Sequence, residues 1–421
     1  MEKAPHNPLL WIPTLSAAEE IPTAVVTYVS LLMFVQFGFD WCWASFCTAL
    51  LLLPSVLKSY LRSKLRHAGH FKRNIHYTEC LLFCSLMALA LYINYCSIVG
   101  WQLFLLLLLV SLLCSVHELL GQMYYNRMLY PRQQKLYNKT KIFASQATVV
   151  ITYGVLIISA GFLEVFFRSV RKAWAMESCL VAGAFMVFAI YNVVVMQNPR
   201  VYNPYRYESL LHAFKNELRV VERIRSTPGS LRLILAFALL LLPQALMFNT
   251  RVFFLLATAE QGGLDCSLQD VGFAQGTIGV LAFSVGAVLG RILREHYGIK
   301  STFWLFAVPL TLSPVFYMMM SQHPLLDNML ALCLMTFSAQ FCFGFGLNGC
   351  MAFVHCISGE RYRNTVDYLY IPLVASVMLL PMALSGWLVT WLGFKSYFLL
   401  DACCAPVAWL ALGLLKIKRM I

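Results

Sequence analysis

A small set of ionisable residues interrupts long apolar stretches of this chain, and these residues are the first candidates for chemistry. An ionisable side chain inside a membrane helix costs about 2.5–3.5 kcal/mol on insertion scales, so it is usually kept for a pathway or a partner. Carboxyl and imidazole groups in such places can carry protons, whereas lysine and arginine can bind anions. The set comprises Glu19, Glu20, Lys58, Glu79, His117, Glu118, Glu177, Arg251 and Asp401.

Two pairs of neighbours are the candidates for proton coupling: Glu19 with Glu20, and His117 with Glu118. Adjacent residues on a helix point about 100° apart, so one glutamate could face a cavity while the other packs against a helix. We favour Glu20, because it precedes an expected turn at Ile21–Pro22. A histidine beside an acid could relay a proton. The alternatives are carboxylates tied to the backbone or to a basic neighbour, and a satisfied histidine at a helix end.

Three polar residues, Lys58, Asn249 and Arg251, are candidates for binding a substrate. Lys58 follows Pro54 by one turn, and it could reach the cytoplasmic surface or hold an anionic group. Arg251 follows Asn249 in the middle of an apolar stretch and could bind a carboxylate through its planar donor fork. Glu79 or Asp401 could instead be its partner, and the sequence does not decide between them.

The composition excludes an ordinary soluble enzyme and a disordered chain. Of 421 residues, 60% are hydrophobic and 12% are charged, against about 25% charged in soluble domains. The net charge of +13 is typical of cytoplasmic loops in a membrane protein, so we expect no nucleic-acid partner. The 14 cysteines contain no C-x-x-C pair, and no nucleotide-binding loop is present. We therefore expect no metal, no cofactor and no enzymatic activity.

Apolar stretches predict twelve membrane-spanning helices in an all-α integral membrane protein. We expect them at residues 9–36, 40–60, 77–97, 100–121, 141–164, 174–196, 232–257, 269–291, 301–321, 327–356, 366–391 and 396–415. The longest polar segment follows the sixth span, which divides the chain into a six-helix bundle at 1–196, a connector at 197–231 and a second bundle at 232–421. The stretch 207–225 has the apolar spacing of an amphipathic interfacial helix, or of a plain linker helix.

The positions of lysine and arginine predict the orientation in the membrane. With both termini inside, 26 of the 32 basic residues lie in inside segments, four lie in outside loops and two lie within spans. This asymmetry places both termini and the connector in the cytoplasm.

The eighth span carries glycines at helical spacing, so we expect one small face that packs closely against another helix. These glycines are Gly272, Gly276, Gly279, Gly286 and Gly290.

Several stretches together resemble one family. They are AEEIPTAVV at 18–26, LPSVLK at 53–58, SVHELLGQMYYNRML at 115–129, GGLDCSLQDVGFAQGTIGVLAFSVGAVLG at 262–290, QFCFGFGLNGC at 340–350 and LPMALSGWLVTWLGFKSYF at 380–398. The chain resembles AmpG-like muropeptide permeases, a branch of the major facilitator superfamily, as a divergent member. It departs from that branch in lacking an acidic residue at 59–69 and in having LLPQALMFN at 241–249.

The resemblance implies a major facilitator fold with two six-helix halves and proton-coupled import of muropeptide-like solutes by alternating access. Gln122 and Tyr125, in the third of these stretches, are further substrate-binding candidates. The resemblance also implies a location in a bacterial inner membrane, with protons, a small solute and the lipid bilayer as partners. We expect a monomer. The alternative is a sensor or assembly partner that has the same fold but transports nothing.

Overall fold

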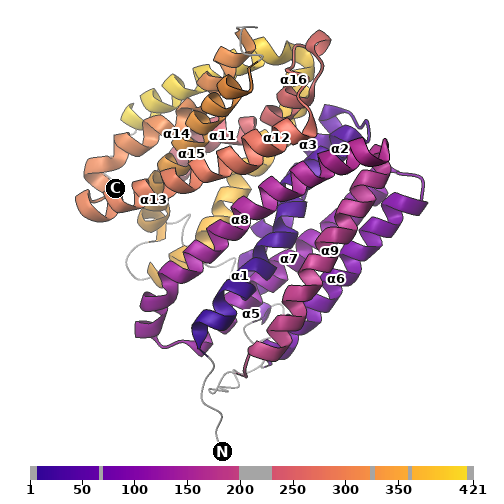
Figure 1. The fold of residues 1–421 in the computed structure, drawn as a ribbon. Helices are drawn as coiled ribbons and strands as arrows, with labels where there is room; N and C mark the ends of the chain where they lie inside the picture. Colours follow the sequence, from indigo (N-terminus) through magenta and orange to yellow (C-terminus); the bar gives the residue numbers. More distant parts are fainter. Residues whose placement is uncertain (1–6, 66–69, 199–229, 323–327, 359–362, 415–421) are drawn as a thin grey trace, which may run out of the picture. The chain divides into compact units, whose positions relative to one another are not determined.

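The computed structural model describes residues 7–65, 70–198, 230–322, 328–358 and 363–414, and it leaves the side chains of 59, 63–64, 230, 299–300, 351–370 and 414 undescribed. Within these ranges the chain forms helices and no strand, as predicted (Figure 1). The first unit contains α1 (Pro8–Ala24), a π-helical turn (Val25–Val29), α2 (Ser30–Gln36), α5 (Lys58–Leu65), α6 (Phe71–Tyr95), α7 (Gly100–Met128), α8 (Pro131–Phe167) and α9 (Val170–Val195). The second unit contains α3 (Trp41–Leu50), α4 (Leu53–Val56), α11 (Ser230–Leu256), α12 (Leu268–Val271), a π-helix (Gly272–Gly279), α13 (Val280–Tyr297), α14 (Ile299–Gln322), α15 (Met329–Ser358) and α16 (Arg363–Leu414).

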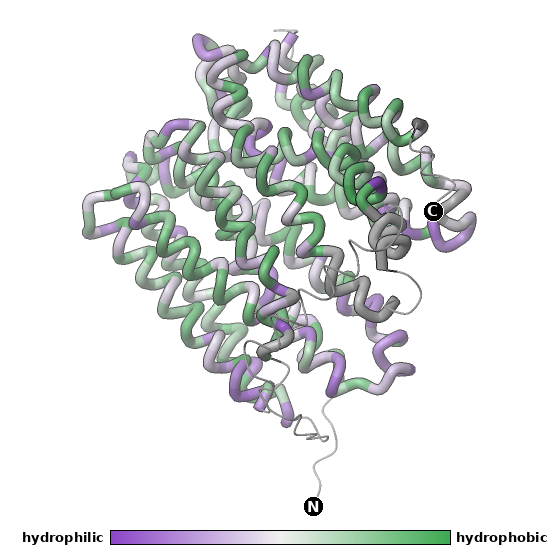
Figure 2. The backbone as a smooth tube through the Cα atoms, turned by 180° about the vertical axis from the view of Figure 1, so that it is seen from behind, coloured by the Kyte–Doolittle hydropathy of each residue, from purple (hydrophilic) through white to green (hydrophobic). Residues whose placement is uncertain are grey.

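Eleven helical segments in the described ranges are long and apolar enough to cross a membrane. The last of these, α16, consists of two helices that meet at Gly393, where φ is 72°. A continuous helix of its 52 residues would measure about 78 Å, far more than the hydrocarbon core of about 30 Å. The described helices thus come close to the twelve predicted crossings, and apolar residues run along most of their length (Figure 2).

Several helices extend beyond the predicted spans. The helix α8 begins at Pro131, although its predicted span begins at residue 141, and α7 continues to Met128 beyond the predicted end at 121. Hydropathy marks where the apolar stretch ends, but backbone hydrogen bonds continue the helix through polar residues in the interface. As a result His117 and Glu118 lie well inside α7 and not at its end.

Prolines shape two of the helices near the candidate residues. The expected turn at Ile21–Pro22 is wrong, because α1 continues through Pro22 and widens into the π-helical turn that starts at Val25. The missing N–H of proline disturbs the helical ladder, and a π-turn is one way to accommodate this. Around Pro54 the second span is broken into α3, α4 and α5, and Lys58 is the first residue of α5.

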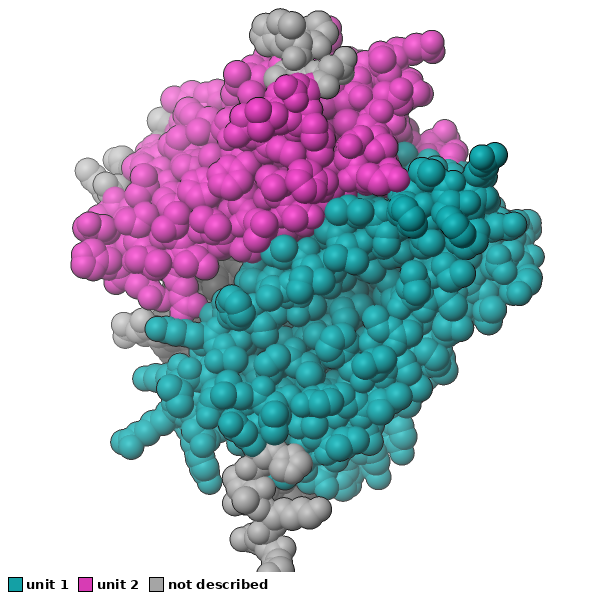
Figure 3. Space-filling model, viewed as in Figure 1, with its two compact units in different colours: residues 1–37, 57–217 teal, residues 38–56, 218–421 magenta. Residues whose placement is uncertain are grey.

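The contacts divide the chain into two compact units, residues 1–37 with 57–217 and residues 38–56 with 218–421 (Figure 3). The core of the first unit includes Trp11, Ile75 and Tyr124. The core of the second includes Phe237 and Phe303. The predicted domain boundaries at 196 and 232 remain predictions, and most of the connector with its expected amphipathic helix lies outside the described residues.

Glycines allow α13 and α15 to approach each other closely. A Cβ atom at Gly286 would lie 2.4 Å from the carbonyl oxygen of Phe341, and one at Gly344 would lie 2.1 Å from that of Phe283. Of the five predicted glycines, Gly279, Gly286 and Gly290 contact α15 residues, whereas Gly272 and Gly276 are buried within the π-helix. A π-helix has more residues per turn than an α-helix, so side chains that follow it point in a different direction. The five glycines therefore do not share one helix face.

Candidate functional site

Lys58 and Glu118 form an ion pair between the start of α5 and the middle of α7. The lysine side chain is 10% exposed and the glutamate side chain 33% exposed. Lys58 is therefore directed into the unit and not to the surface. An ion pair with one partly exposed member can open when another anion competes for the lysine.

Glu19 lies next to this ion pair, with its carboxylate against α7. Its Oε1 atom would be only 2.2 Å from a Cβ atom at Gly121, so the glycine provides the space that the carboxylate occupies. That oxygen is shielded from solvent and accepts no hydrogen bond from the described residues. The charges within electrostatic reach are those of Lys141, His117, Glu118 and Lys58. A carboxylate without a partner is costly to shield from water, and a bound proton removes that cost.

Glu20 has a different environment, although it directly follows Glu19. Its Oε1 atom accepts a hydrogen bond from the hydroxyl of Ser145 on α8. The two glutamates therefore contact different helices, α7 and α8, as expected for adjacent helical positions.

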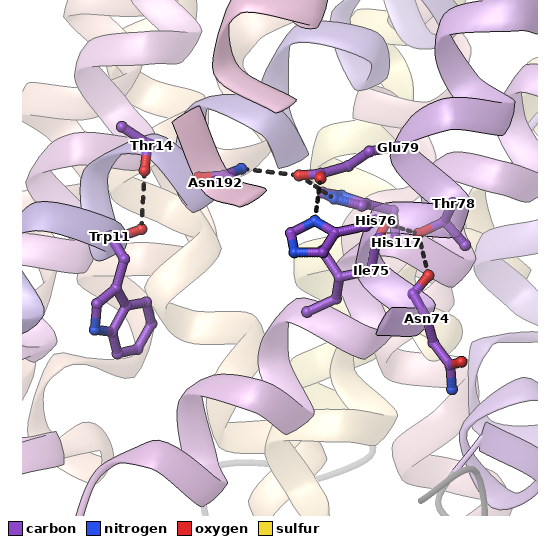
Figure 4. Close-up of polar contacts among 9 residues, drawn as sticks. All are labelled: Trp11, Thr14, Asn74, Ile75, His76, Thr78, Glu79, His117 and Asn192. Carbon is purple, nitrogen blue, oxygen red and sulfur yellow. Dashed lines mark hydrogen bonds and ion pairs between the residues drawn. The ribbon is translucent and has the colours of Figure 1, made fainter. Parts of the chain in front are cut away.

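His117 contacts Glu79 and not its neighbour Glu118. Its Nε2 atom lies 3.5 Å from Oε1 of Glu79, and both side chains are 1% exposed. Glu79 also accepts hydrogen bonds from Nδ1 of His76 at 3.0 Å and from the amide of Asn192 at 2.8 Å. Figure 4 shows these three side chains converging on the carboxylate from α6, α7 and α9. His117 and Glu118 thus have different partners, because they point to different sides of α7, and their part in proton coupling remains a prediction.

Tyr125 and Gln122 are the further candidates on α7, and Tyr125 makes contacts within the first unit. Tyr125 is 7% exposed, packs against Trp11, and donates a hydrogen bond to the carbonyl oxygen of Gln134 at 3.2 Å. The ammonium group of Lys141 lies 4.8 Å from the centre of its ring. Gln122 is half-buried.

The candidates in the second unit are Asn249 and Arg251 on α11. Asn249 is fully buried and donates a hydrogen bond to the carbonyl oxygen of Met382 at 3.4 Å. The guanidinium of Arg251 lies 5.1 Å from the ring centre of Phe248. Asp401 is fully buried, and neither of its carboxylate oxygens has a hydrogen bond from the described residues. Asp401 is therefore not hydrogen-bonded to Arg251.

Sequence reasoning missed a buried network of amides and hydroxyls in the second unit. The amide of Gln275 donates to the hydroxyl of Tyr317 at 2.5 Å, and the amide of Gln340 donates to Oε1 of Gln275 at 3.3 Å. Gln244 donates to the hydroxyl of Ser313 at 2.8 Å. Uncharged polar residues in apolar spans were the available signal, but polar residues also serve helix packing in membranes.

No protein-family model and no curated protein matches the sequence of this chain. Solved structures match its fold over nearly the whole length. The nucleoside transporter NupG is 13% identical with a TM-score of 0.72, over 97% of this chain and 98% of that chain. A bacterial homologue of the human lysosomal transporter Spinster, inward-facing and occupied, is 12% identical with a TM-score of 0.73, over 97% and 96%.

A mutant of the peptide transporter POT, in complex with alafosfalin, is 12% identical with a TM-score of 0.71, over 99% and 96% of the two chains. The chain is thus a multi-pass helical membrane protein. Its fold is the major facilitator fold, shared with these transporters.

Proposed function

We propose that this protein is a secondary active transporter that couples the import of a small anionic solute to protons. The similar solved structures are a nucleoside transporter, a homologue of a lysosomal transporter and a peptide transporter, and they support transport as the activity. The observation that carries the proposal is Glu19, whose buried Oε1 has no hydrogen bond from the described residues, beside the ion pair of Lys58 and Glu118.

In this account Glu19 binds the coupling proton and Lys58 holds the solute. An anionic group of the solute would compete with Glu118 for the ammonium group of Lys58. The charge on Glu118 would then be released next to Glu19, which favours a proton on Glu19 because two adjacent carboxylates repel each other. Protons and solute would shift the equilibrium between outward-open and inward-open states by binding one of them better.

Muropeptides are the substrate class that we propose, on the family resemblance in the sequence. They carry carboxylates, which the ammonium group of Lys58 can bind. The proposal includes a bacterial inner membrane with both termini in the cytoplasm, on the distribution of basic residues.

Uptake by proteoliposomes tests the proposal. Purified protein is reconstituted, an acid-outside pH gradient is imposed, and accumulation of a labelled anhydro-muropeptide is measured with and without a protonophore. We expect gradient-dependent accumulation that the protonophore abolishes. An excess of unlabelled nucleoside, sugar or dipeptide should not compete. Absence of uptake of every solute class would favour a sensor or assembly partner instead.

A further inference from the structure

The cluster around Glu79 contains buried titratable groups that the proposed coupling site does not use. It joins three helices of the first unit, because Glu79 and His76 lie on α6, His117 on α7 and Asn192 on α9. Glu79 is 1% exposed and His117 is fully buried. A buried carboxylate that faces three such side chains is held in one position.

His117 is the member of this cluster that lies within electrostatic reach of Glu19. Its Nε2 atom lies 3.5 Å from Oε1 of Glu79, and neither Nε2 nor Nδ1, both of which are shielded from solvent, has a hydrogen bond among the described residues. Gly121, against which Glu19 rests, is one helical turn further along α7, so it lies on the same face as His117. Glu19 Oε1 and His117 Nδ1 are thus two shielded groups without hydrogen-bond partners on facing helices.

We propose that His117, held by Glu79, accepts the coupling proton that Glu19 releases, so that the cluster is a second proton-binding site. This inference rests on the proposed function, since Glu19 is the proton donor. The O–H bond of the Glu19 carboxyl breaks and an N–H bond forms at Nδ1 of His117, through a small side-chain rotation or a bridging water. One neutral acid and one neutral imidazole become a carboxylate and an imidazolium, and no other reactant is needed.

The surrounding charges favour both products of this transfer. The imidazolium faces the carboxylate of Glu79, and the Glu19 carboxylate has Lys58 and Lys141 within electrostatic reach. Two carboxyl groups oppose the charge on Glu19: Glu118, which is paired with Lys58, and Glu20, which is the next residue on α1. The neighbours contributed by α9 are Asn192 and the ring of Phe185, neither of which titrates. His76 and Asn192 are positioning residues, because they orient Glu79.

Nitrogen NMR of the full chain, labelled with ¹⁵N-histidine, tests this site directly. The chain has 9 histidines, and His117→Gln identifies the signal of His117. If His117 binds the proton, we expect it to carry protons on both ring nitrogens at about pH 6 and on one at about pH 8. In Glu79→Gln it should stay neutral at about pH 6, because the carboxylate that stabilises its charge is gone.

Glu177→Gln is the matched control. Glu177 is also a buried glutamate of the first unit, with a hydrogen bond from Ser159 at 2.8 Å, and its replacement should leave the His117 signal unchanged. A neutral His117 at about pH 6 in the wild type would overturn the proposal. A charged His117 in Glu79→Gln would overturn the role of Glu79. If Glu79→Gln does not fold, the wild-type spectrum still shows whether His117 binds a proton.

Transport by His117→Gln tests the transfer from Glu19. We expect pH-driven uptake of the labelled muropeptide to fall by about tenfold or more, as on loss of a general acid or base. Exchange of labelled for unlabelled solute without a gradient should stay close to wild type. Normal pH-driven uptake would overturn the relay. If the wild type accumulates no muropeptide, the proposed function fails, whereas the NMR result still decides whether His117 binds a proton.

Discussion

Lys58 and Glu118 form an ion pair that connects α5 to α7 within the first unit. Replacement of either residue leaves the charge of the other unpaired and largely shielded from water. We therefore expect Lys58→Met and Glu118→Gln each to lower the free energy of unfolding, and the double variant to lower it by less than their sum. The coupling energy should be about 0.5–3 kcal/mol. The coupling energy is measured from the unfolding of the purified wild type, the two single variants and the double variant in mixed detergent.

The exposed pair of Arg291 and Glu295, one turn apart on α13, is the control for that cycle, with side chains 43% and 60% exposed. Its coupling energy should be no more than about 0.3–0.5 kcal/mol. Strictly additive effects of the Lys58 and Glu118 substitutions would show that their ion pair is not formed in the folded protein.

Gly121→Ala should alter coupling without unfolding the protein. The added Cβ atom would lie 2.2 Å from Oε1 of Glu19, which is the end of a flexible side chain and can move away. We expect thermal stability near that of the wild type, together with a clear loss of pH-driven uptake. Gly183→Ala on α9 is the control, because nothing lies within 4 Å of its Cβ position. Normal coupling in Gly121→Ala would mean that the position of this carboxylate does not matter.

The order of the helices and, closely, their number could be predicted from the sequence, because each crossing requires a long apolar stretch. The breaks on either side of the short helix that contains Pro54, and the kink at Gly393, are also local consequences of residue type. Partners across helices could not be predicted in this way. Nothing local shows that Glu118 turns to Lys58 while His117 turns to Glu79, because that depends on how α5, α6 and α7 pack around each other.

Glu79 illustrates the same limit. In the sequence it is a single acid in an apolar stretch, and the residues that bind it come from positions 76, 117 and 192. The spacing of His76 and Glu79 on one helix was a local signal that could have indicated part of this cluster. The preference for Glu20 over Glu19 also depended on local sequence. The hydrogen bond from Ser145 to Glu20, and the absence of one to Glu19 Oε1 among the described residues, favour Glu19 as the proton carrier.

Gly286→Ala should destabilise the second unit. Its Cβ atom would lie 2.4 Å from the carbonyl oxygen of Phe341 and 2.9 Å from the amide nitrogen of Phe345, and backbone atoms cannot easily move aside. Overpacking of this kind costs about 1–3 kcal/mol, and Gly286→Leu should cost more. Thermal unfolding compared with Gly183→Ala, which meets open space, measures the effect. Equal stability of the two alanine variants would mean that α13 and α15 do not pack closely.

The connector between the two bundles should face the cytoplasm, as the distribution of basic residues predicts. A cysteine introduced at Ser226, which lies outside the described residues, provides the test. A membrane-impermeant thiol reagent should label it in inverted membrane vesicles and not in intact cells. Strong labelling in intact cells would reverse the proposed orientation.

The central claim is that a carboxyl of the first unit carries the coupling proton, and Glu19→Gln tests it most directly. A glutamine keeps the shape and hydrogen bonding of a neutral carboxyl but cannot titrate, so it cannot respond to a pH difference. In proteoliposomes, we expect Glu19→Gln to exchange labelled muropeptide at close to the wild-type rate and to lose accumulation driven by an acid-outside gradient. Glu20→Gln and Glu118→Gln are measured alongside it. Accumulation at the normal rate and with the normal pH dependence in all three variants would contradict the account.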